Sequence, residues 1–387
     1  MRKILSLILV AILSQSFNLY ADDFSQVDGM INDAIENEYF PGAQLLIGTD
    51  EEILYQKSYG KFTYDDDAKP VENYSIFDLA SLTKVIATTS VIMKLYDEGK
   101  LDLYDRVAYY FPEFGVHDKE KITIQNLLLH NSGLKAWIPF YQTCKTKQDV
   151  LDTIYNLELD YEPETGFVYS DLNAILLGEI VEKVSGKTLD VYCQENIFEP
   201  LKMLSTAFNP NDEAKENILP TEFDNNWRNK LLKGEVHDEA AYLIGGVSGN
   251  AGLFSNAENI YALVSTLLNK GIYYNPYTRG MRLDTMFKES TVDLFTSKYT
   301  YASYFNTRAF GWDTKPEPTS YRTPCGELMS ENCFGHTGYT GTSVWCDKER
   351  KLIIIFLTNR VYPSRSHTGI GKLRPELHNK IIEIFTN

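Results

Sequence analysis

The chain has 387 residues, of which 43% are hydrophobic and 23% charged, a composition typical of a globular protein. Its formal net charge of -16 argues against nucleic acid and anionic membrane surfaces as partners. The length suits two or three domains or one large two-part domain, and no internal repeat stands out.

The first segment, 1–21, has the pattern of a secretory signal peptide. Arg2 and Lys3 form a basic start, an apolar run follows, and Ala21 suits a cleavage site. The apolar run is short for a membrane span, although an uncleaved anchor stays an alternative. We therefore expect a periplasmic or secreted protein with a mature part, 22–387, that has no stable membrane span.

The hydrophobic pattern after this segment predicts an α+β fold. Residues 24–37 look helical, and 44–48 and 52–60 read as the two strands of a hairpin. We expect an antiparallel sheet built from both chain ends (about 24–80 and 300–387) and flanked by helices, with an inserted, mostly helical region at about 85–290. Further helices are expected at 122–130, 148–157, 174–184, 189–197, 260–268 and 375–385, and further strands at 309–312, 342–346 and 352–358.

A candidate nucleophile, Ser81, opens a long apolar run that reads as a buried helix with Asp78 as its N-terminal cap. Lys84 lies one helical turn from Ser81, on the same face. A serine needs a neighbouring base, and a lysine in a dry site can have its pKa lowered enough to serve. Ser58 and Lys61 have the same spacing, but they lie in a strand and turn and would not share a face.

A second candidate segment lies before the predicted helix at 174–184. Tyr169 could act as general acid or base near Lys84, as a phenolate or a hydrogen-bonded phenol. Asp171 or Asn173 could bind a substrate amide. The structural alternative is that Tyr169 packs in the interior and Asp171 caps the helix.

A glycine-rich run, Gly245 to Gly252, lacks the ending of a phosphate-binding loop. It reads either as close backbone packing or as the wall of a cleft. The five cysteines match no zinc pattern. Cys325 and Cys333 could form a disulfide in an exported protein, or stay free. No metal and no cofactor is expected.

The third candidate segment, His336-Thr337-Gly338-Tyr339, precedes a predicted strand. A charged or hydrogen-bonding histidine beside a threonine suits a substrate carboxylate, and glycine lets a ligand approach the backbone. The alternative is a neutral His336 that only bonds within the sheet edge. A similar sequence at His367 reads as loop.

The three segments in this order resemble the serine β-lactamase and penicillin-binding protein superfamily. The resemblance is to its class C-like branch, and within that to the type 4B penicillin-binding proteins and related esterases. It covers nearly the whole mature chain and includes 127–134, 234–238, 245–255 and 357–360. Asp171 stands where asparagine is usual in that branch, and His336 replaces the lysine common in β-lactamases.

The resemblance implies that Ser81 is acylated, that Lys84 exchanges its proton and that Tyr169 relays protons. It places Asp171, His336, Thr337, Gly338 and Tyr339 in the substrate site. The N–H groups of Ser81 and Tyr339 would form the oxyanion hole.

The leading hypothesis is an exported DD-carboxypeptidase or esterase that acts on a peptidoglycan D-alanyl peptide or a related ester. A class C-like β-lactamase, acting on a β-lactam, is the second enzymatic alternative. A cell-wall-binding protein without catalysis is the third hypothesis. Sequence alone does not choose the substrate, because the shape of the pocket depends on loops.

Overall fold

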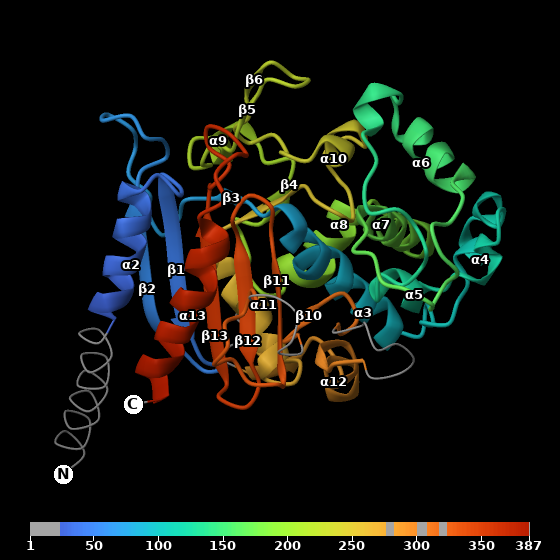
Figure 1. Ribbon diagram of the computed structural model, residues 1–387. Helices are drawn as coiled ribbons and strands as arrows, with labels where there is room; N and C mark the ends of the chain where they lie inside the picture. The colour runs from blue at the N-terminus through green and yellow to red at the C-terminus, as the bar shows by residue number, and fades with distance from the viewer. Residues whose placement is uncertain (1–23, 276–281, 300–307, 317–322, 387) are drawn as a thin grey trace, which may run out of the picture.

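The computed structural model describes residues 24–275, 282–299, 308–316 and 323–386. A sheet flanked by helices lies beside a mostly helical part, as Figure 1 shows. The predicted signal segment, 1–21, lies outside the described residues. None of the helices in the described ranges is long and apolar enough to cross a membrane.

The main sheet joins the two ends of the chain, as predicted. Its strand order is β10-β11-β12-β13-β1-β2, and all neighbouring pairs are antiparallel. The N-terminal strand β1 lies inside the sheet, next to the edge strand β2, and pairs on its other side with the late strand β13, with Ala43 opposite Thr358. The strands are β1 (Gly42–Gly48), β2 (Ile53–Gly60), β10 (Asp313–Thr314), β11 (Cys333–Thr337), β12 (Ser343–Asp347) and β13 (Leu352–Thr358).

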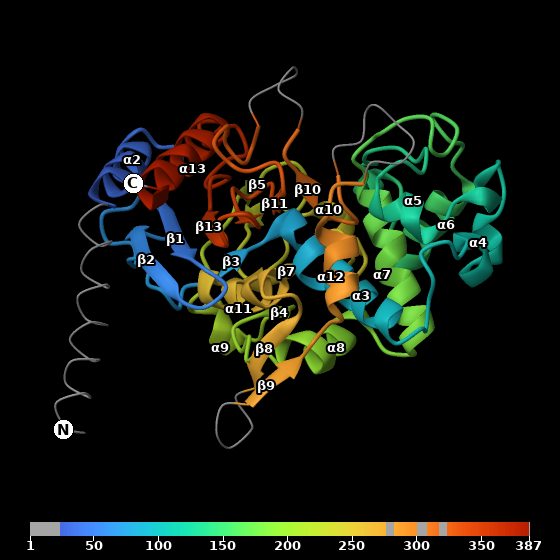
Figure 2. The same ribbon diagram turned by 90° about the horizontal axis from the view of Figure 1, so that it is seen from below.

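Apolar residues alternate between the two faces of this sheet and pack into two cores. In β13, Ile353 and Ile355 face the larger core, whereas Ile354 and Phe356 face the smaller one. Alternate strand residues point to opposite faces, so a strand buried on both sides is apolar throughout. Helices α2 (Ser25–Glu36) and α13 (Ile370–Thr386) cover one face, and α11 (Ala257–Leu268) covers the other (Figure 2).

The remaining elements build the helical part and the loops around it. These are α3 (Ser90–Asp97), α4 (Val107–Tyr110), α5 (Ile124–Leu128), α6 (Lys147–Asn156), α7 (Asp171–Ser185), α8 (Leu189–Cys193), α9 (Asp212–Lys215), α10 (Glu239–Leu243) and α12 (Glu289–Thr296). Short strands also occur: β3 (Phe77–Asp78), β4 (Ala207–Phe208), β5 (Phe223–Asp224), β6 (Lys230–Leu231), β7 (Leu253–Ser255), β8 (Ile272–Asn275) and β9 (Arg282–Thr285).

Three sequence predictions differ from the structure in the C-terminal part. The strand expected at 309–312 is displaced to β10, after a bridge between Arg308 and Asp313. The strand β11, which carries His336, was not predicted, because its glycine and polar residues hide the alternating pattern. The last helix begins at Ile370, so Pro375 lies inside it.

The five cysteines are buried free thiols, so the proposed Cys325–Cys333 disulfide is not formed. The glycine-rich run combines both roles that its sequence allowed. Gly249 packs against α7, where an added Cβ would lie 1.9 Å from the Ala174 carbonyl oxygen. Ala251, two residues later, lines a cavity at the candidate site.

Replacement of Gly249 by alanine should therefore destabilise the protein. The new methyl group has no space against the α7 backbone, and overpacking of this kind costs about 1–3 kcal/mol of unfolding free energy. Denaturant unfolding measures the loss. Gly29→Ala, at a helical position where an added Cβ meets nothing within 4 Å, is the matched control. Equal stability of the Gly249→Ala variant and the parent would contradict the contact.

Candidate active site

Ser81 and Lys84 are in direct contact, as their spacing predicted. Lys84 Nζ lies 3.0 Å from Ser81 Oγ. In the decoy pair, Ser58 Oγ instead bonds Asn73, and Lys61 Nζ bonds the Asp66 carbonyl. Only the first pair therefore joins a hydroxyl and an amine.

The local helix differs from the prediction of one capped α-helix. Ser81 lies in a 3₁₀ turn, η1 (Ala80–Leu82), followed by a π-helix, η2 (Lys84–Thr89), and then α3. Asp78 is not the helix cap: its Oδ1 accepts a hydrogen bond from Ala80 N at 2.8 Å. Ala80 has a φ of 46°, which is unusual for a residue with a Cβ. The chain thus turns sharply just before Ser81.

Lys84 is charged in this structure, contrary to the expectation of a lowered pKa. Burial alone would lower its pKa, since the side chain is only 4% exposed. Asp171 Oδ1 lies 2.6 Å from Nζ, and the Asn250 carbonyl accepts a further bond at 3.0 Å. The attraction of the Asp171 carboxylate outweighs burial and raises the pKa of Lys84 above its usual value.

Tyr169 lies beside this ion pair, with its ring centroid 5.0 Å from Lys84 Nζ. Its hydroxyl is buried and makes no hydrogen bond of ordinary geometry with the described residues. Burial raises the pKa of Tyr169, although nearby Lys84 and Ser81 act in the opposite direction. The side chain is therefore a neutral phenol rather than the phenolate that the sequence left open.

The residues after Tyr169 have separate roles. Ser170, not Asp171, caps α7: its side chain accepts from Asn173 N. Asp171 is the first residue of α7 and contacts Lys84. Asn173 is fully buried, and its side chain bonds Ser132 Oγ at 2.6 Å and the His130 ring at 3.2 Å. Asp171 is thus at the site, and Asn173 supports it from behind.

His336 is buried, and its surroundings favour the neutral form that the sequence left as the alternative. It is 2% exposed on β11, and its Nδ1 lies 2.8 Å from the Thr337 carbonyl oxygen. A carbonyl only accepts hydrogen bonds, so Nδ1 carries the proton. Burial, aided by the positive charges of Arg308 and Lys84, lowers the pKa of His336 to about 4, although Asp313 opposes the shift. His336 is neutral near pH 7 and supplies no positive charge there.

The segment after His336 docks directly onto the residues before Ser81. Thr340 Oγ1 donates to the Asp78 carbonyl at 2.7 Å, and Thr342 Oγ1 donates to the Leu79 carbonyl at 3.0 Å. Gly338 must be glycine here, because an added Cβ would lie 2.4 Å from the Leu79 carbonyl oxygen. Within the described residues the Tyr339 N–H donates no hydrogen bond, so it is available to a ligand.

Two cavities meet at Ser81 and Tyr169. The larger, about 640 Å³, is lined by residues Thr337 to Tyr339 and by basic side chains. The smaller, about 310 Å³, is lined by Asp171 and a wall from the loop before α10. The basic residues of the larger cavity are Arg308, Arg360 and Arg374, together with the neutral His336.

Sequence reasoning missed these three arginines. Arg374 on α13 is 8% exposed, and its Nε makes no hydrogen bond with the described residues. Burial and the like charge of Arg360 lower its pKa to about 10, so Arg374 stays charged at neutral pH. Arg360 ends the segment 357–360, which the sequence had marked without a role, and nothing local identified Arg374.

No group of three or more metal-ligating side chains gathers in the part of the chain that the structure describes. The arrangement therefore offers a hydroxyl in contact with an amine–carboxylate pair, a buried phenol and two cavities. One cavity carries positive charge, as a site for an anionic group requires.

The lowered pKa of His336 predicts a change in stability with pH. Below pH ~6.5 the unfolded chain protonates this histidine, whereas the folded protein keeps it neutral to about pH 4. The free energy of unfolding should therefore decrease as the pH is lowered. His336 should contribute about 2 kcal/mol of the decrease between pH 7 and pH 5.

In the His336→Gln variant that loss should be smaller than in the parent by this amount. Denaturant unfolding at both pH values measures it, with His367→Gln, on the loop before α13, as the control. The same loss in the His336→Gln variant and the parent would show that His336 is not the group.

Curated relatives from two bacteria are similar to most of this chain. A relative from Bacillus subtilis (strain 168), "N-acetylmuramyl-L-alanine amidase", is 34% identical over 379 residues, with 89% of this chain and 81% of the relative covered. A relative from Escherichia coli (strain K12), "Putative D-alanyl-D-alanine carboxypeptidase", is 35% identical over 369 residues, covering 87% and 82%.

Solved structures share the fold at low sequence identity. "EstCE1, a hydrolase with promiscuous acyltransferase activity" has a TM-score of 0.71 at 20% identity, covering 96% of this chain and 99% of that one. The octameric penicillin-binding protein homologue from Pyrococcus abyssi has a TM-score of 0.70 at 20% identity, covering 93% and 78%. Residues 27–377 match the family described as Beta-lactamase, and the chain therefore belongs to the beta-lactamase family.

Proposed function

We propose that the protein is an exported serine hydrolase that forms an acyl-enzyme at Ser81, most closely a DD-carboxypeptidase of the class C-like, type 4B kind. The observation that carries the proposal is the 3.0 Å contact between Ser81 Oγ and Lys84 Nζ at the meeting point of two cavities. A hydroxyl held by a proton-handling partner in a cleft is the arrangement that nucleophilic catalysis requires.

The charges at the site suggest how the serine proton moves. Lys84 rests as a cation paired with Asp171, so it is not itself a free base. When Ser81 attacks a carbonyl carbon, Lys84 passes one proton to Asp171 and takes the proton of Ser81. The net transfer is from Ser81 to the Asp171 carboxylate. Tyr169, a neutral phenol beside both groups, then delivers a proton to the leaving group and regains one from the pair.

Backbone donors at Ser81 and Tyr339 suit the negative oxygen of the tetrahedral intermediate. Ser81 lies in the first turn of η1, where N–H groups lack intrahelical partners. The Tyr339 N–H is free of internal bonds within the described residues. Two donors of this kind form an oxyanion hole.

The arginines favour a substrate with a carboxylate beside the scissile bond. Arg360 and Arg374 line the larger cavity together with Ser81, and the neutral His336 offers no cation there. A D-alanyl-D-alanine peptide ends in such a carboxylate. The name of the B. subtilis relative indicates a different bond, between N-acetylmuramyl and L-alanine, and that bond has no free carboxylate beside it. We therefore favour the carboxypeptidase over the amidase, with small esters as secondary substrates.

The pattern of segment 1–21 supports a proposal for the location of the reaction. Its basic start and short apolar run are those of a signal peptide, so we propose a periplasmic or secreted enzyme that meets peptidoglycan peptides there. The net charge of -16 agrees with a small-molecule or peptide substrate rather than nucleic acid.

Intact-protein mass spectrometry with a penicillin and with a D-alanyl-D-alanine peptide tests the function. One acyl group should add to the parent and to Ser58→Ala, and none to Ser81→Ala. Slow release of the penicilloyl group together with peptide cleavage supports the carboxypeptidase, whereas fast release indicates a β-lactamase. Labelling of Ser81→Ala would overturn the assignment, and a parent that no substrate acylates would be a non-catalytic protein.

The Asp171→Asn variant tests the proton path. Without the carboxylate, burial of Lys84 prevails and its pKa should fall, so the neutral amine becomes available at lower pH. In the variant the neutral Lys84 must itself accept the Ser81 proton, so the acylation rate should rise with pH as Lys84 loses its proton, a rise that the parent does not need because its Asp171 carboxylate accepts the proton. Below this rise the acylation rate should be about tenfold or more lower than in the parent, because the proton acceptor is lost. A pH profile identical to that of the parent would exclude Asp171 from proton transfer.

A further inference from the structure

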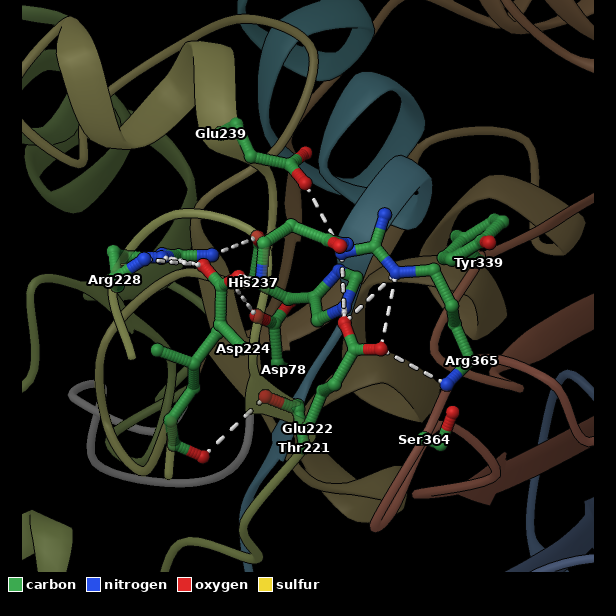
Figure 3. A network of polar contacts seen from close by, with 12 residues as sticks. Asp78, Thr221, Glu222, Asp224, Arg228, His237, Glu239, Tyr339, Ser364 and Arg365 are labelled. Carbon is green, nitrogen blue, oxygen red and sulfur yellow. Dashed lines mark hydrogen bonds and ion pairs between the residues drawn. The ribbon is translucent and has the colours of Figure 1, made fainter. Parts of the chain in front are cut away.

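We propose that His237, Glu222 and Arg365 are positioning residues that hold Tyr339, and with it the Tyr339 N–H, beside Ser81. They touch neither reacting atom; they act through the side chain of Tyr339. The inference rests on the proposed acyl-enzyme reaction at Ser81 and deepens it. Figure 3 shows these groups from four separate segments of the chain meeting at one place.

Tyr339 is partly exposed, but neighbouring residues contact its ring and bond its backbone. Its side chain is 48% exposed, yet the ring stacks on His237, with centroids 5.7 Å apart and planes at 27°. Arg360 Cζ lies 4.5 Å from the same ring, and Arg360 Nε donates to the Tyr339 carbonyl at 2.8 Å. The preceding carbonyl, of Gly338, accepts from Gly341 N at 3.0 Å. The orientation of the Tyr339 N–H is thus set by its neighbours.

Glu222 fixes the His237 ring. His237 Nε2 lies 2.8 Å from Glu222 Oε2, and Arg365 Nη2 lies 2.7 Å from the same oxygen. Burial would raise the pKa of Glu222, but the bonds from His237 and Arg365 lower it to about 2. Since an ionised carboxylate only accepts hydrogen bonds, His237 Nε2 carries a proton. The ring is thereby held in one tautomer and one orientation.

The same group is anchored to the residues before Ser81. The backbone N–H of His237 donates to Asp78 Oδ2 at 2.7 Å, and Asp78 Oδ1 holds Ala80 N. Arg365 also pairs with Glu239 at 3.0 Å. His237, Glu239, Arg365 and Tyr339 all line the smaller cavity together with Ser81. The network therefore connects the nucleophile turn with the loop that offers the second oxyanion donor.

The Glu222→Gln variant tests the proposal, because it removes the charge that orients His237 and keeps the shape of the side chain. The probes are p-nitrophenyl acetate and its thiono analogue, in which sulfur replaces the carbonyl oxygen. An oxyanion hole stabilises the oxygen transition state more than the sulfur one. Acylation rate and affinity are measured per acylated Ser81, which removes any effect of misfolded protein.

The expected result is a fall in the acylation rate of about 10–100-fold, somewhat less than the loss of a whole oxyanion donor, with affinity changed less than about threefold. The ratio of oxygen-ester to thionoester rates should fall with it. His237→Phe, which keeps a stacking ring but loses the bond to Glu222, should show the same trend. If Glu222→Gln does not fold, the rates of His237→Phe are compared with those of the parent instead.

Asp347→Asn is the matched control. Asp347 is also a buried carboxylate paired with an arginine, Arg350, but it lies at the end of β12 away from Ser343 and the active-site loop. This variant should lose stability and keep the parent's acylation rate and rate ratio.

Two results would overturn the inference alone. One is an acylation rate in the positioning variants equal to that of the parent. The other is an equal loss for both esters, which would show a purely structural role. A parent that no probe acylates overturns the proposed function and this inference with it.

Discussion

The site depends on the hydrogen bonds that the buried Asp78 carboxylate accepts. One oxygen accepts from Ala80 N and the other from His237 N, while the Asp78 carbonyl accepts from Thr340. Burial raises the pKa of Asp78, although the bonds from His237 and Ala80 oppose this. The residue thus joins the turn that presents Ser81, the wall of one cavity and the loop after β11. Each of these segments comes from a different part of the chain, and a buried acceptor without its donors is costly.

The site separates its charges around Ser81. Lys84 and Asp171 form a close ion pair, so the Ser81 hydroxyl lies beside two opposite charges that nearly cancel. The positive charge that remains lies in the larger cavity, on arginines from β13's end and α13. In a cleft that excludes water, charges that are already fixed in place act strongly on a bound molecule. They therefore favour one orientation of that molecule. Ser81 thus lies between a cavity lined by Asp171 of the charge-balanced Lys84–Asp171 pair and a cavity that carries positive charge.

Much of the fold was predictable, because apolar periodicity is strong where strands are buried on both faces. The strand 352–358 was predicted at its observed bounds, and the contact of Ser81 with Lys84 was predicted from their spacing at the start of a buried apolar run. The charge states were not predictable. The pKa of Lys84 depends on Asp171 from another helix, and that of His336 depends on burial in a strand whose pattern is weak. The three arginines of the larger cavity were not predictable either, because they lie far apart in the sequence and come together only in the folded protein.

The place of β1 between β13 and β2 has a consequence for how the sheet is assembled. This strand leaves the ribosome among the first elements, and all seven of its residues are buried in the finished sheet. One of its two edges pairs only with β13, close to the end of the chain. Until synthesis reaches that strand, β1 keeps an open apolar edge of the kind that invites aggregation. The main sheet is therefore incomplete until β13 has been made, and a chain truncated before β13 would expose this edge of β1.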